Sequence, residues 1–337
     1  MSYWYSNTAP HDDIIVSSRI RLARNISGIP FPSRISSEQL INVNEKVSKA
    51  IKESNTPFAK TLRVISMSDI PEIERYSMVE RHIISKEFAL KPENRSIIIS
   101  DNENICIMIG EEDHIRIQVI LPGLQLEKAY ETAQEIDRLL CERLDIAFDK
   151  NLGFLTECPT NLGTGLRASV MMHLPVTDMS DGMKTLAQSI NKIGFTVRGM
   201  YGEGTKALAS LYQISNQITL GISEKNAIDN LKIIALQIAE KERKNRQSIQ
   251  KIEIEDMCMR SLGVLQNARI LDSREMMERL SEIKLGISMG ILSINILPIK
   301  ILIEGQPYML MKKFGNLSSE ERDIQRANMI REMLLEV

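Results

Sequence analysis

Residues 105–121 read ICIMIGEEDHIRIQVIL, two isoleucine-rich segments joined by a short polar turn. Ile105–Ile109 and Ile115–Leu121 are short and rich in β-branched residues, which is typical of strands. In the second segment isoleucine and valine alternate with polar side chains, so Arg116 is expected to point away from the core. The stretch therefore predicts strands of a sheet with a charged turn between them.

Segments on either side extend this pattern. Ile97–Ile99 predicts another short strand, and apolar residues recur with helical spacing over 126–144 and 224–243. The sequence therefore predicts an α+β fold, in which strands and helices lie in separate layers.

The last third of the chain has a different pattern. After about residue 245 it is nearly all helical, with capping signals at Asp272-x-x-Glu275 and Ser318-x-x-Glu321. We expect a mixed catalytic domain over residues 1–245 and a smaller all-helical domain over residues 246–337.

Composition narrows the class of protein. Of the 337 residues 43% are apolar and 26% charged, as in a soluble globular chain. Lys+Arg is 42 and Asp+Glu is 44, a net charge of −2, which argues against a protein that binds nucleic acid directly. Four scattered cysteines without a C-x-x-C pair argue against structural zinc. The polar N-terminal segment has no signal-peptide core, so we expect a cytoplasmic protein that does not enter a membrane.

Arginines recur in the segments that carry chemistry. In Ile14–Arg24, read as a strand, Ser17, Arg19 and Arg21 share one face. Their bases are then roughly 7 Å apart, a repulsive placement unless an anion lies between them. A solvated polar face with free counterions is the alternative, since surface arginines are common.

The turn at residues 110–114 contains three adjacent acids, Glu111, Glu112 and Asp113. Such a cluster is usually a charged turn. Beside an apolar strand, it can also hold a cationic substrate or transfer a proton.

A glycine-rich turn follows at residues 157–170, where Cys158 precedes a proline and Arg167 shares a predicted face with Ser169, Met171 and His173. It is not a P-loop, because no G-K-[ST] follows. Taken alone, Cys158 is more often a small buried residue than a nucleophile, and His173 is more often a structural histidine than a ligand.

A second glycine-rich segment, residues 197–205, predicts a loop whose backbone can closely approach a ligand or another part of the chain. Its Gly202-x-Gly204-x-x-Ala207 spacing also imitates a dinucleotide fingerprint. Near the C-terminus, Arg322 and Arg326 share a helix face, where a bound anion or Asp323 would relieve their repulsion. In isolation, an ordinary solvated helix is the more common explanation of such a pair.

Together these segments resemble the signature sequences of the phosphagen (guanidino) kinase superfamily: S-S-R-x-R at 17–21, E-E-D-H-x-R at 111–116 and C-P-T-N-L-G-T-G-x-R at 158–167. The similarity spans roughly residues 13–245. The loop 198–203 and the R-D-x-x-R-A segment at 322–327 are similar to the bacterial protein-arginine kinase family. Small-molecule guanidino kinases carry an N-terminal helical domain before their first arginine motif, and we expect this chain to lack it.

The resemblance implies a guanidino-kinase fold, an antiparallel sheet flanked by helices, with a C-terminal helical dimerisation domain. It assigns catalysis to Glu112 and Glu203, with a supporting role for Cys158, and a phosphoarginine-binding allosteric pocket to Arg322, Asp323 and Arg326. It implies an ATP site made of Ser17, Ser18, Arg19, Ile20, Arg21, His82, Arg116, Arg167, Ala168, Ser169, Val170, Met171, Arg198, Gly199, Met200, Tyr201, Gly202 and Glu203.

The implied activity is transfer of the γ-phosphoryl group of ATP to protein arginine. An arginine guanidinium has a pKa above ~12 and is a poor nucleophile, so Glu112 is expected to accept a proton while Glu203 orients the acceptor. Mg²⁺ would be held mainly by the nucleotide phosphates, with no dedicated metal site on the protein.

Partners also follow from the resemblance: protein substrates with exposed arginines, such as a DNA-binding stress-response repressor, a Clp-type protease that degrades marked proteins, a zinc-binding activator and a second copy of the chain. Phosphorylation turns a cationic side chain into an anion and would weaken a repressor's grip on DNA.

Three alternatives remain open at this point. The chain is a kinase of free arginine or another small guanidino compound, an inactive phosphoarginine-binding adaptor, or a dinucleotide dehydrogenase. The last rests only on the glycine spacing at residues 202–207.

Overall fold

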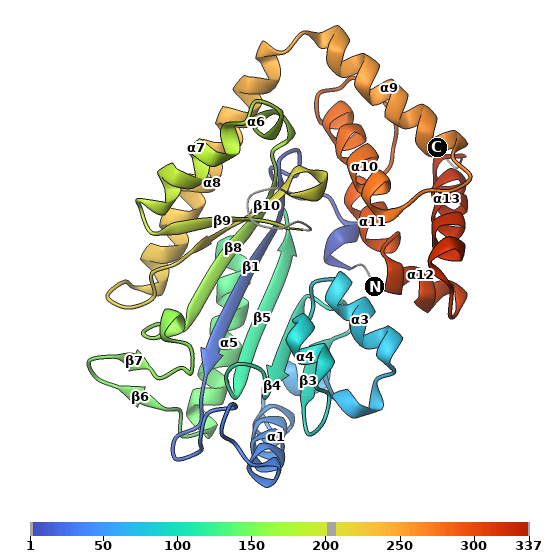
Figure 1. Cartoon of the computed structure of the whole chain (residues 1–337). Helices are drawn as coiled ribbons and strands as arrows, with labels where there is room; N and C mark the ends of the chain where they lie inside the picture. The colour runs from blue at the N-terminus through green and yellow to red at the C-terminus, as the bar shows by residue number, and fades with distance from the viewer. Residues whose placement is uncertain (1–2, 201–206, 336–337) are drawn as a thin grey trace. The chain divides into compact units, whose positions relative to one another are not determined.

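The computed structural model describes residues 3–200 and 207–335 (Figure 1). Eight strands of this part form one sheet in the order β2-β3-β4-β5-β1-β8-β10-β9, and β6 and β7 form a separate hairpin. The strands are β1 (Ile15–Arg24), β2 (Leu62–Ser66), β3 (Ser96–Ser100), β4 (Ile105–Ile109), β5 (Ile115–Pro122), β6 (Phe148–Asp149), β7 (Gly153–Phe154), β8 (Leu166–His173), β9 (Phe195–Gly199) and β10 (Leu211–Asn216).

Helices flank this sheet and make up the last third of the described chain. They are α1 (Ser37–Lys52), α2 (Phe58–Thr61), α3 (Glu72–Glu80), α4 (Lys86–Leu90), α5 (Leu126–Arg143), α6 (Pro175–Met179), α7 (Gly182–Asn191), α8 (Glu224–Ser248), α9 (Lys251–Asn267), α10 (Ser273–Ser288), α11 (Pro298–Glu304), α12 (Pro307–Phe314) and α13 (Ser319–Leu335). A single 3₁₀ turn, η1 (Trp4–Ser6), precedes β1.

The chain divides into two compact units that interleave along the sequence. Unit 1 comprises residues 1–7, 17–169 and 215–232, and unit 2 comprises residues 8–16, 170–214 and 233–337. Strands β1, β8 and β10 and helix α8 each contribute residues to both units. Because α8 runs through residue 245 and the units group residues by contact, the division at 245/246 stays a prediction.

In unit 1 the register of the sheet sets the direction of the arginines. Strand β5 is antiparallel to both β1 and β4. Arg21 lies opposite Gln118, and Ala23 lies opposite Arg116. Since paired residues share a face and side chains alternate along a strand, Arg19, Arg21 and Arg116 all point to the same face. Helix α5 packs against β5 from the other side, behind the strands in Figure 1.

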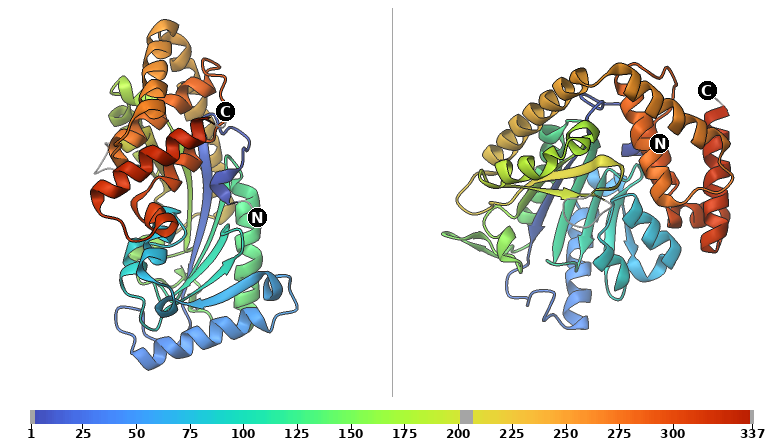
Figure 2. Two further views of the ribbon diagram at one scale, coloured as in Figure 1. Left: turned by 90° about the vertical axis from the view of Figure 1, so that its right-hand side faces the viewer. Right: turned by 45° about the horizontal axis from the view of Figure 1, so that its top comes forward.

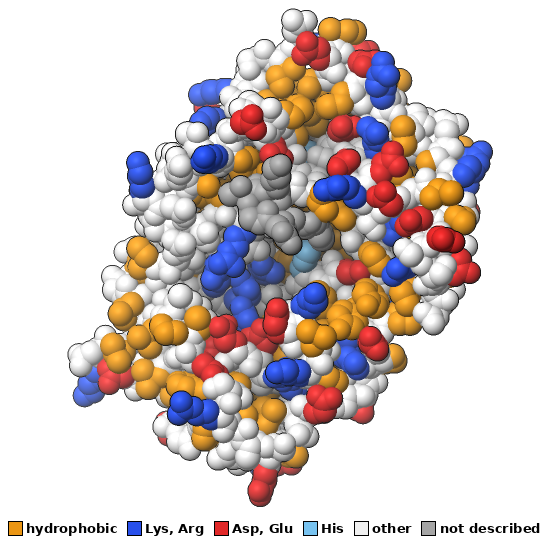
Figure 3. All heavy atoms as spheres, in the orientation of Figure 1, with side chains coloured by type: hydrophobic (Ala, Val, Ile, Leu, Met, Phe, Trp, Pro, Cys, Tyr) orange, Lys and Arg blue, Asp and Glu red, His pale blue; other side chains and the backbone are white. Residues whose placement is uncertain are grey.

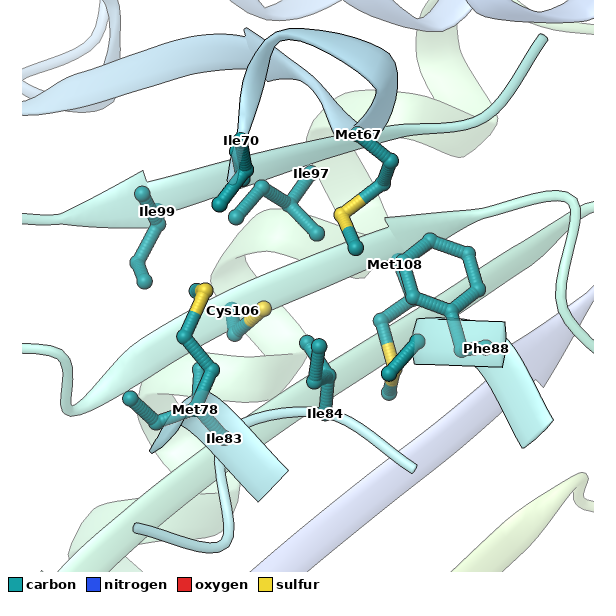
Figure 4. Packing of buried hydrophobic residues seen from close by; sticks show 11 residues of the cluster. Met67, Ile70, Met78, Ile83, Ile84, Phe88, Ile97, Ile99, Cys106 and Met108 are labelled. Carbon is teal, nitrogen blue, oxygen red and sulfur yellow. The ribbon is translucent and has the colours of Figure 1, made fainter. Parts of the chain in front are cut away.

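The arginine face of β3 and β4 is covered by the chain between Met67 and Ala89. Met78, Ile83 and Phe88 pack there against Ile97 and Cys106 in a cluster of buried apolar residues (Figure 4). Phe88 is fully buried and comes from α4, which places this short helix beside the charged turn. The predicted alternation of the isoleucine-rich strands is thus confirmed, with a hydrophobic layer on each face.

Unit 2 contains a buried polar network. The Glu242 carboxylate is fully buried and accepts hydrogen bonds from the N–H groups of Val176 and Thr177, at the start of α6. Arg246 donates to Glu242 at 3.2 Å and to Ser288 Oγ at 2.8 Å. The network joins α8 to α6 through Glu242 and to α10 through Arg246. Within α8 the two buried charges neutralise each other.

The helical prediction for the C-terminal third is confirmed. Helix α9 packs against both α10 and α13, and the orange-to-red helices lie side by side in Figure 2. Asp272 caps α10 by accepting the Glu275 N–H at 2.8 Å, and Ser318 and Glu321 exchange capping hydrogen bonds at the start of α13. None of the described helices is long and apolar enough to cross a membrane.

Candidate active site

The arginine row of unit 1 is crowded with like charges. Burial, followed by the positive charges of Arg116 and Arg167, lowers the pKa of the Arg19 guanidinium to about 10. Burial and the same neighbours together with Arg19 lower the pKa of Arg21 well below its usual value, against an opposing effect of Glu111. A bound anion would stabilise the charged form of these guanidinium groups, because it offsets the cost of their burial and the repulsion between them.

Arg21 gives the clearest indication of an anion-binding site. Its Nε is buried and meets no hydrogen-bond partner among residues 3–200 and 207–335. A buried guanidinium nitrogen without a partner is costly, and a phosphate oxygen would satisfy it. The residues present therefore fit a bound polyphosphate. Basic side chains gather in the middle of the face shown in Figure 3, with acidic ones beside them.

The two glutamates of the charged turn have different surroundings. Glu111 is 8% exposed and accepts hydrogen bonds from Ser85 Oγ at 2.7 Å, from the Glu112 N–H at 3.0 Å and from Arg116. Burial alone would raise the pKa of Glu111, but the charge of Arg116 and these three hydrogen bonds lower it. Glu112 is 41% exposed, and its carboxylate lies 3.9 Å from Arg116 Nη1. Glu112 is therefore the carboxylate open to an acceptor guanidinium.

Asp113, the third acid, joins this turn to the cysteine loop. Its Oδ1 accepts hydrogen bonds from Asn25 Nδ2 at 2.6 Å and from the Glu157 N–H at 2.8 Å. Glu157 directly precedes Cys158, whose Sγ lies 3.0 Å from Thr160 Oγ1. The two segments that carry Glu112 and Cys158 are thus fixed to each other through one carboxylate.

The glycine-rich turn requires glycine for close backbone approach. A Cβ on Gly163, which has φ +108°, would lie 2.4 Å from the Thr219 carbonyl oxygen. A Cβ on Gly165, at φ +64°, would lie 2.6 Å from the Ala23 carbonyl oxygen. Both distances are too short for any other residue at these positions without a backbone shift. The turn is held in place immediately before Arg167.

Other predicted ATP residues of unit 1 are in part structural. Ser18 Oγ donates to the Gly123 carbonyl at 2.8 Å and accepts the Gln125 N–H at 2.9 Å. Ile20 is fully buried and points away from the arginine face, while Ser17 is buried as well. In β8, Arg167 Nη2 donates to Ser215 Oγ at 3.2 Å, with Ala168 and Ser169 buried beside it.

Two side chains hold the backbone of residues 81–83 around His82 in place. Gln118 Nε2 donates to the carbonyl oxygens of His82 and Ile83, each at 2.9 Å, and Trp4 Nε1 donates to the Arg81 carbonyl at 3.1 Å. The Trp4 and His82 rings lie 6.2 Å apart. His82 adopts φ +61°, a conformation that these contacts maintain. Burial, followed by the charge of Arg19, lowers the pKa of the His82 imidazole to about 3.

The low pKa of His82 predicts acid sensitivity. Its folded-state pKa lies below the ordinary 6.5, so between pH 6.5 and about 3 the unfolded chain binds more protons. Stability should therefore fall as pH drops through this range. His114, His173 and Glu111 act in the same direction, because their pKa values are also lowered. The free energy of unfolding, measured with urea, should fall less steeply between pH 6.5 and 4 in His82→Gln than in the parent. The same pH dependence in both proteins would refute a neutral, buried His82.

Several predicted residues belong to unit 2 or lie outside the described residues. Val170 and Met171 are buried in β8. Arg198 is exposed near the end of β9, followed by Gly199, and the Met200 N–H donates to the Leu211 carbonyl at 2.9 Å. The structure does not describe Tyr201, Gly202 or Glu203. The carboxylate predicted to orient the acceptor, that of Glu203, therefore lies outside the described residues.

The predicted phosphoarginine residues near the C-terminus include a structural arginine. Arg326 is buried, and it donates to the carbonyls of Gly305 and Leu271 at 2.7 Å and to Asp323 Oδ1 at 2.5 Å. Arg322 is partly buried, with Nη1 3.8 Å from the sulfur of Met311. Arg326 and Asp323 thus hold each other, and the binding role of the three stays a prediction.

Sequence reasoning missed the residues that support the site. Asn25, Ser85 and Gln118 are uncharged and contribute hydrogen bonds, Asn25 to Asp113, Ser85 to Glu111 and Gln118 to the His82 carbonyl oxygen. The one signal in the sequence is Gln118, a polar residue between the apolar Ile117 and Val119. No group of three or more His, Cys, Asp or Glu side chains within the described ranges is placed to hold a metal ion.

Comparisons with known proteins agree with this geometry. Residues 42–245 match the family model described as the ATP:guanido phosphotransferase C-terminal catalytic domain, and residues 251–337 match the one described as the protein-arginine kinase McsB C-terminal domain. A protein-arginine kinase of Halothermothrix orenii is 45% identical over 99% of this chain and 97% of its own length. One from Bacillus subtilis is 43% identical over 99% of this chain and 93% of its own length.

The fold is also found among solved structures. A crystal structure of lombricine kinase matches with a TM-score of 0.62 at 22% identity, over 71% of this chain and 69% of that one. At this identity the match supports the fold alone. The predicted antiparallel sheet flanked by helices is thus confirmed.

Proposed function

Because this chain belongs to the protein-arginine kinase family, we propose that it transfers the γ-phosphoryl group of ATP to arginine side chains of proteins. One observation carries the proposal: Arg19, Arg21 and Arg116 share one sheet face, and Arg21 lacks a partner for its buried Nε among the described atoms. This row of arginines is suited to bind an anion. Its last member, Arg116, lies 3.9 Å from Glu112, an exposed carboxylate that can bind a cation.

In the proposed mechanism the arginine row binds the triphosphate and offsets the charge that develops on the transferred group. Glu112 binds the acceptor guanidinium and takes its proton as the new N–P bond forms and the bond from phosphorus to the ADP oxygen breaks. Glu111 stays ionised beside Arg116 and keeps that arginine in place. Magnesium, when bound with the nucleotide, would neutralise phosphate oxygens.

Glu203 is proposed to orient the acceptor, and Cys158 to lie near it in a supporting role. The hydrogen bonds of Asp113 support the second proposal, because they fix the cysteine loop to the turn that carries Glu112. Orientation of the acceptor matters because the nitrogen lone pairs of a guanidinium are delocalised over a planar group, so the attacking nitrogen must be held in line with the transferred phosphorus.

The experiment that tests this function separates protein from free arginine as acceptor. The chain is incubated with Mg·ATP and either a basic protein or free arginine, and products are analysed by mass spectrometry without acid, which preserves the N–P bond. We expect phosphoarginine on the protein. Labelling of free arginine alone would favour a small-guanidino kinase, and no labelling of either would favour a binding adaptor.

We propose finer features of the biology as well, and for the substrate they rest on charge. A DNA-binding repressor is a fitting substrate, because phosphorylation converts its phosphate-contacting arginines into anions. We further propose that phosphoarginine marks proteins for a Clp-type protease in a stress response, and that a zinc-binding activator and a second copy of the chain are its partners in the cytoplasm. Binding of phosphoarginine at Arg322, Asp323 and Arg326 would act allosterically.

A further inference from the structure

A pocket of about 570 Å³ opens beside the catalytic turn in unit 1. One part of its wall contains Arg21, Arg116 and Glu112, which the proposed function already uses. The other part contains Phe88, Lys91 and Arg95, which it does not use. A volume of this size exceeds what a single guanidinium needs and lies in the range that holds a small ligand or a few side chains.

Arg95 lies directly against the catalytic turn. A Cβ built on Gly110 would lie 3.5 Å from Arg95 Cγ, so the stem of Arg95 passes over the residue before Glu111. Its guanidinium carbon lies 5.6 Å from the centre of the Phe88 ring. Burial lowers the pKa of Arg95, while Glu111 and then Glu93 act in the opposite direction. The head group is therefore within electrostatic range of the catalytic turn.

The charge of Arg95 has no close counter-ion. Its guanidinium makes no hydrogen bond or ion pair to any side chain in the described part of the chain, and neither does the ammonium group of Lys91. Glu111, the carboxylate of the wall that acts on the pKa of Arg95, is already held by Arg116 and Ser85. A partly buried arginine in this situation favours an anionic ligand.

Counting the charges of the wall shows which ligand is needed. It contains four cations, Arg21, Lys91, Arg95 and Arg116, and three carboxylates, Glu87, Glu111 and Glu112. In the proposed reaction Arg21 faces phosphate, Arg116 pairs with Glu111, and Glu112 pairs with the acceptor. Among the residues of the wall, Lys91 and Arg95 then remain against Glu87, an excess of one positive charge beside the acceptor arginine. Glu93, outside the wall, also acts on the charge of Arg95.

We propose that Arg95, with Lys91, forms a subsite that recognises an acidic side chain of the substrate protein one or two residues from the arginine to be phosphorylated. This inference rests on the proposed function and specifies its substrate class. Neighbouring residues of an extended peptide are ~3.4 Å apart along the chain, so a flanking carboxylate reaches the pocket while the target guanidinium is at Glu112. The buried Phe88 ring supports Arg95 in this position.

The test uses three peptides that share one central arginine and differ only in the two residues on each side, which are all Ala, all Asp or all Lys. Phosphorylation is followed by ³¹P NMR at neutral pH. We expect kcat/KM of the parent to be about three- to tenfold higher for the Asp peptide than for the Ala peptide, and lower still for the Lys peptide. Arg95→Gln should reduce this preference to less than about twofold, and Arg95→Glu should reverse it.

The matched control is Arg63→Gln, in β2 of the same unit. Arg63 is 64% exposed and pairs with Asp101 at 2.8 Å on the surface, so its loss should leave the peptide preference unchanged. The Ala peptide reports basal activity and shows that each variant is folded and active.

Three results would overturn the subsite. Equal peptide ratios in the parent and in Arg95→Glu, with the Ala peptide still phosphorylated, would leave the proposed function standing and remove the subsite. An increase in KM for ATP that is the same for all three peptides would assign Arg95 to the nucleotide instead. A parent that phosphorylates free arginine but no peptide would refute both proposals.

Discussion

Glu112→Gln is expected to lower kcat about 10²- to 10⁴-fold while leaving the affinity for ATP close to that of the parent. Glutamine keeps the shape of the side chain but cannot accept the acceptor's proton. Glu112 is 41% exposed and only 3.9 Å from Arg116, so its replacement breaks no buried pair and should not unfold the chain. Stopped-flow turnover and equilibrium ATP binding measure the two quantities separately.

Glu87→Gln is the control for this experiment. Glu87 lines the same pocket from α4 but is not one of the proposed catalytic residues. Its replacement by glutamine removes the same charge as Glu112→Gln does. Its kcat should change by less than about threefold, which is within the effect of one exposed charge. If Glu112→Gln turned over as fast as Glu87→Gln, the proposed base would be wrong and the proton would need another acceptor.

Arg24→Met is expected to destabilise the protein by about 3–5 kcal/mol, the largest stability effect predicted for the chain. The Arg24 side chain is fully buried and pairs with Asp137 through two hydrogen bonds of 2.8 and 2.7 Å. It also donates to the Thr164 carbonyl at 2.9 Å and lies 3.5 Å from the centre of the Phe154 ring. Its loss would leave the largely buried Asp137 carboxylate without its counter-charge.

Two variants distinguish this buried pair from an ordinary ion pair. Arg260→Met removes a pair with Asp256 of 2.7 Å in which Arg260 is 75% exposed, and it should cost less than about 0.5 kcal/mol. Arg24→Met combined with Asp137→Leu should recover part of the loss, because the Asp137 carboxylate is then no longer buried without a counter-charge, while Glu224, 3.6 Å from Arg24 and 22% exposed, still loses its cation. Urea unfolding followed by circular dichroism measures all three, and equal losses for Arg24→Met and Arg260→Met would contradict the prediction.

Local patterns in the sequence were enough to predict the strands and the helix caps. Ile105–Ile109 is a strand with the predicted boundaries, and Asp272 caps its helix as its spacing indicates. These features depend on a few neighbouring residues, so their physical causes are visible in the sequence. The shared face of Arg19 and Arg21 follows from the same rule of alternation.

The arrangement of the site could not be predicted in the same way. Nothing local distinguishes Glu111 from Glu112, because only the fold brings Ser85 and Arg116 to the first of them. Arg24 and Asp137 are 113 residues apart in the chain. Arg326 has the spacing of a ligand-binding residue, yet its burial against the Gly305 and Leu271 carbonyls depends on helix packing that no motif records.

The contact between Trp4 and His82 has a practical consequence. The sequence contains a single tryptophan, so indole emission from this protein originates at one place, beside the imidazole of the proposed nucleotide site. A spectrofluorometer can therefore follow events at that imidazole in the unmodified chain, without an attached dye and without counting turnovers.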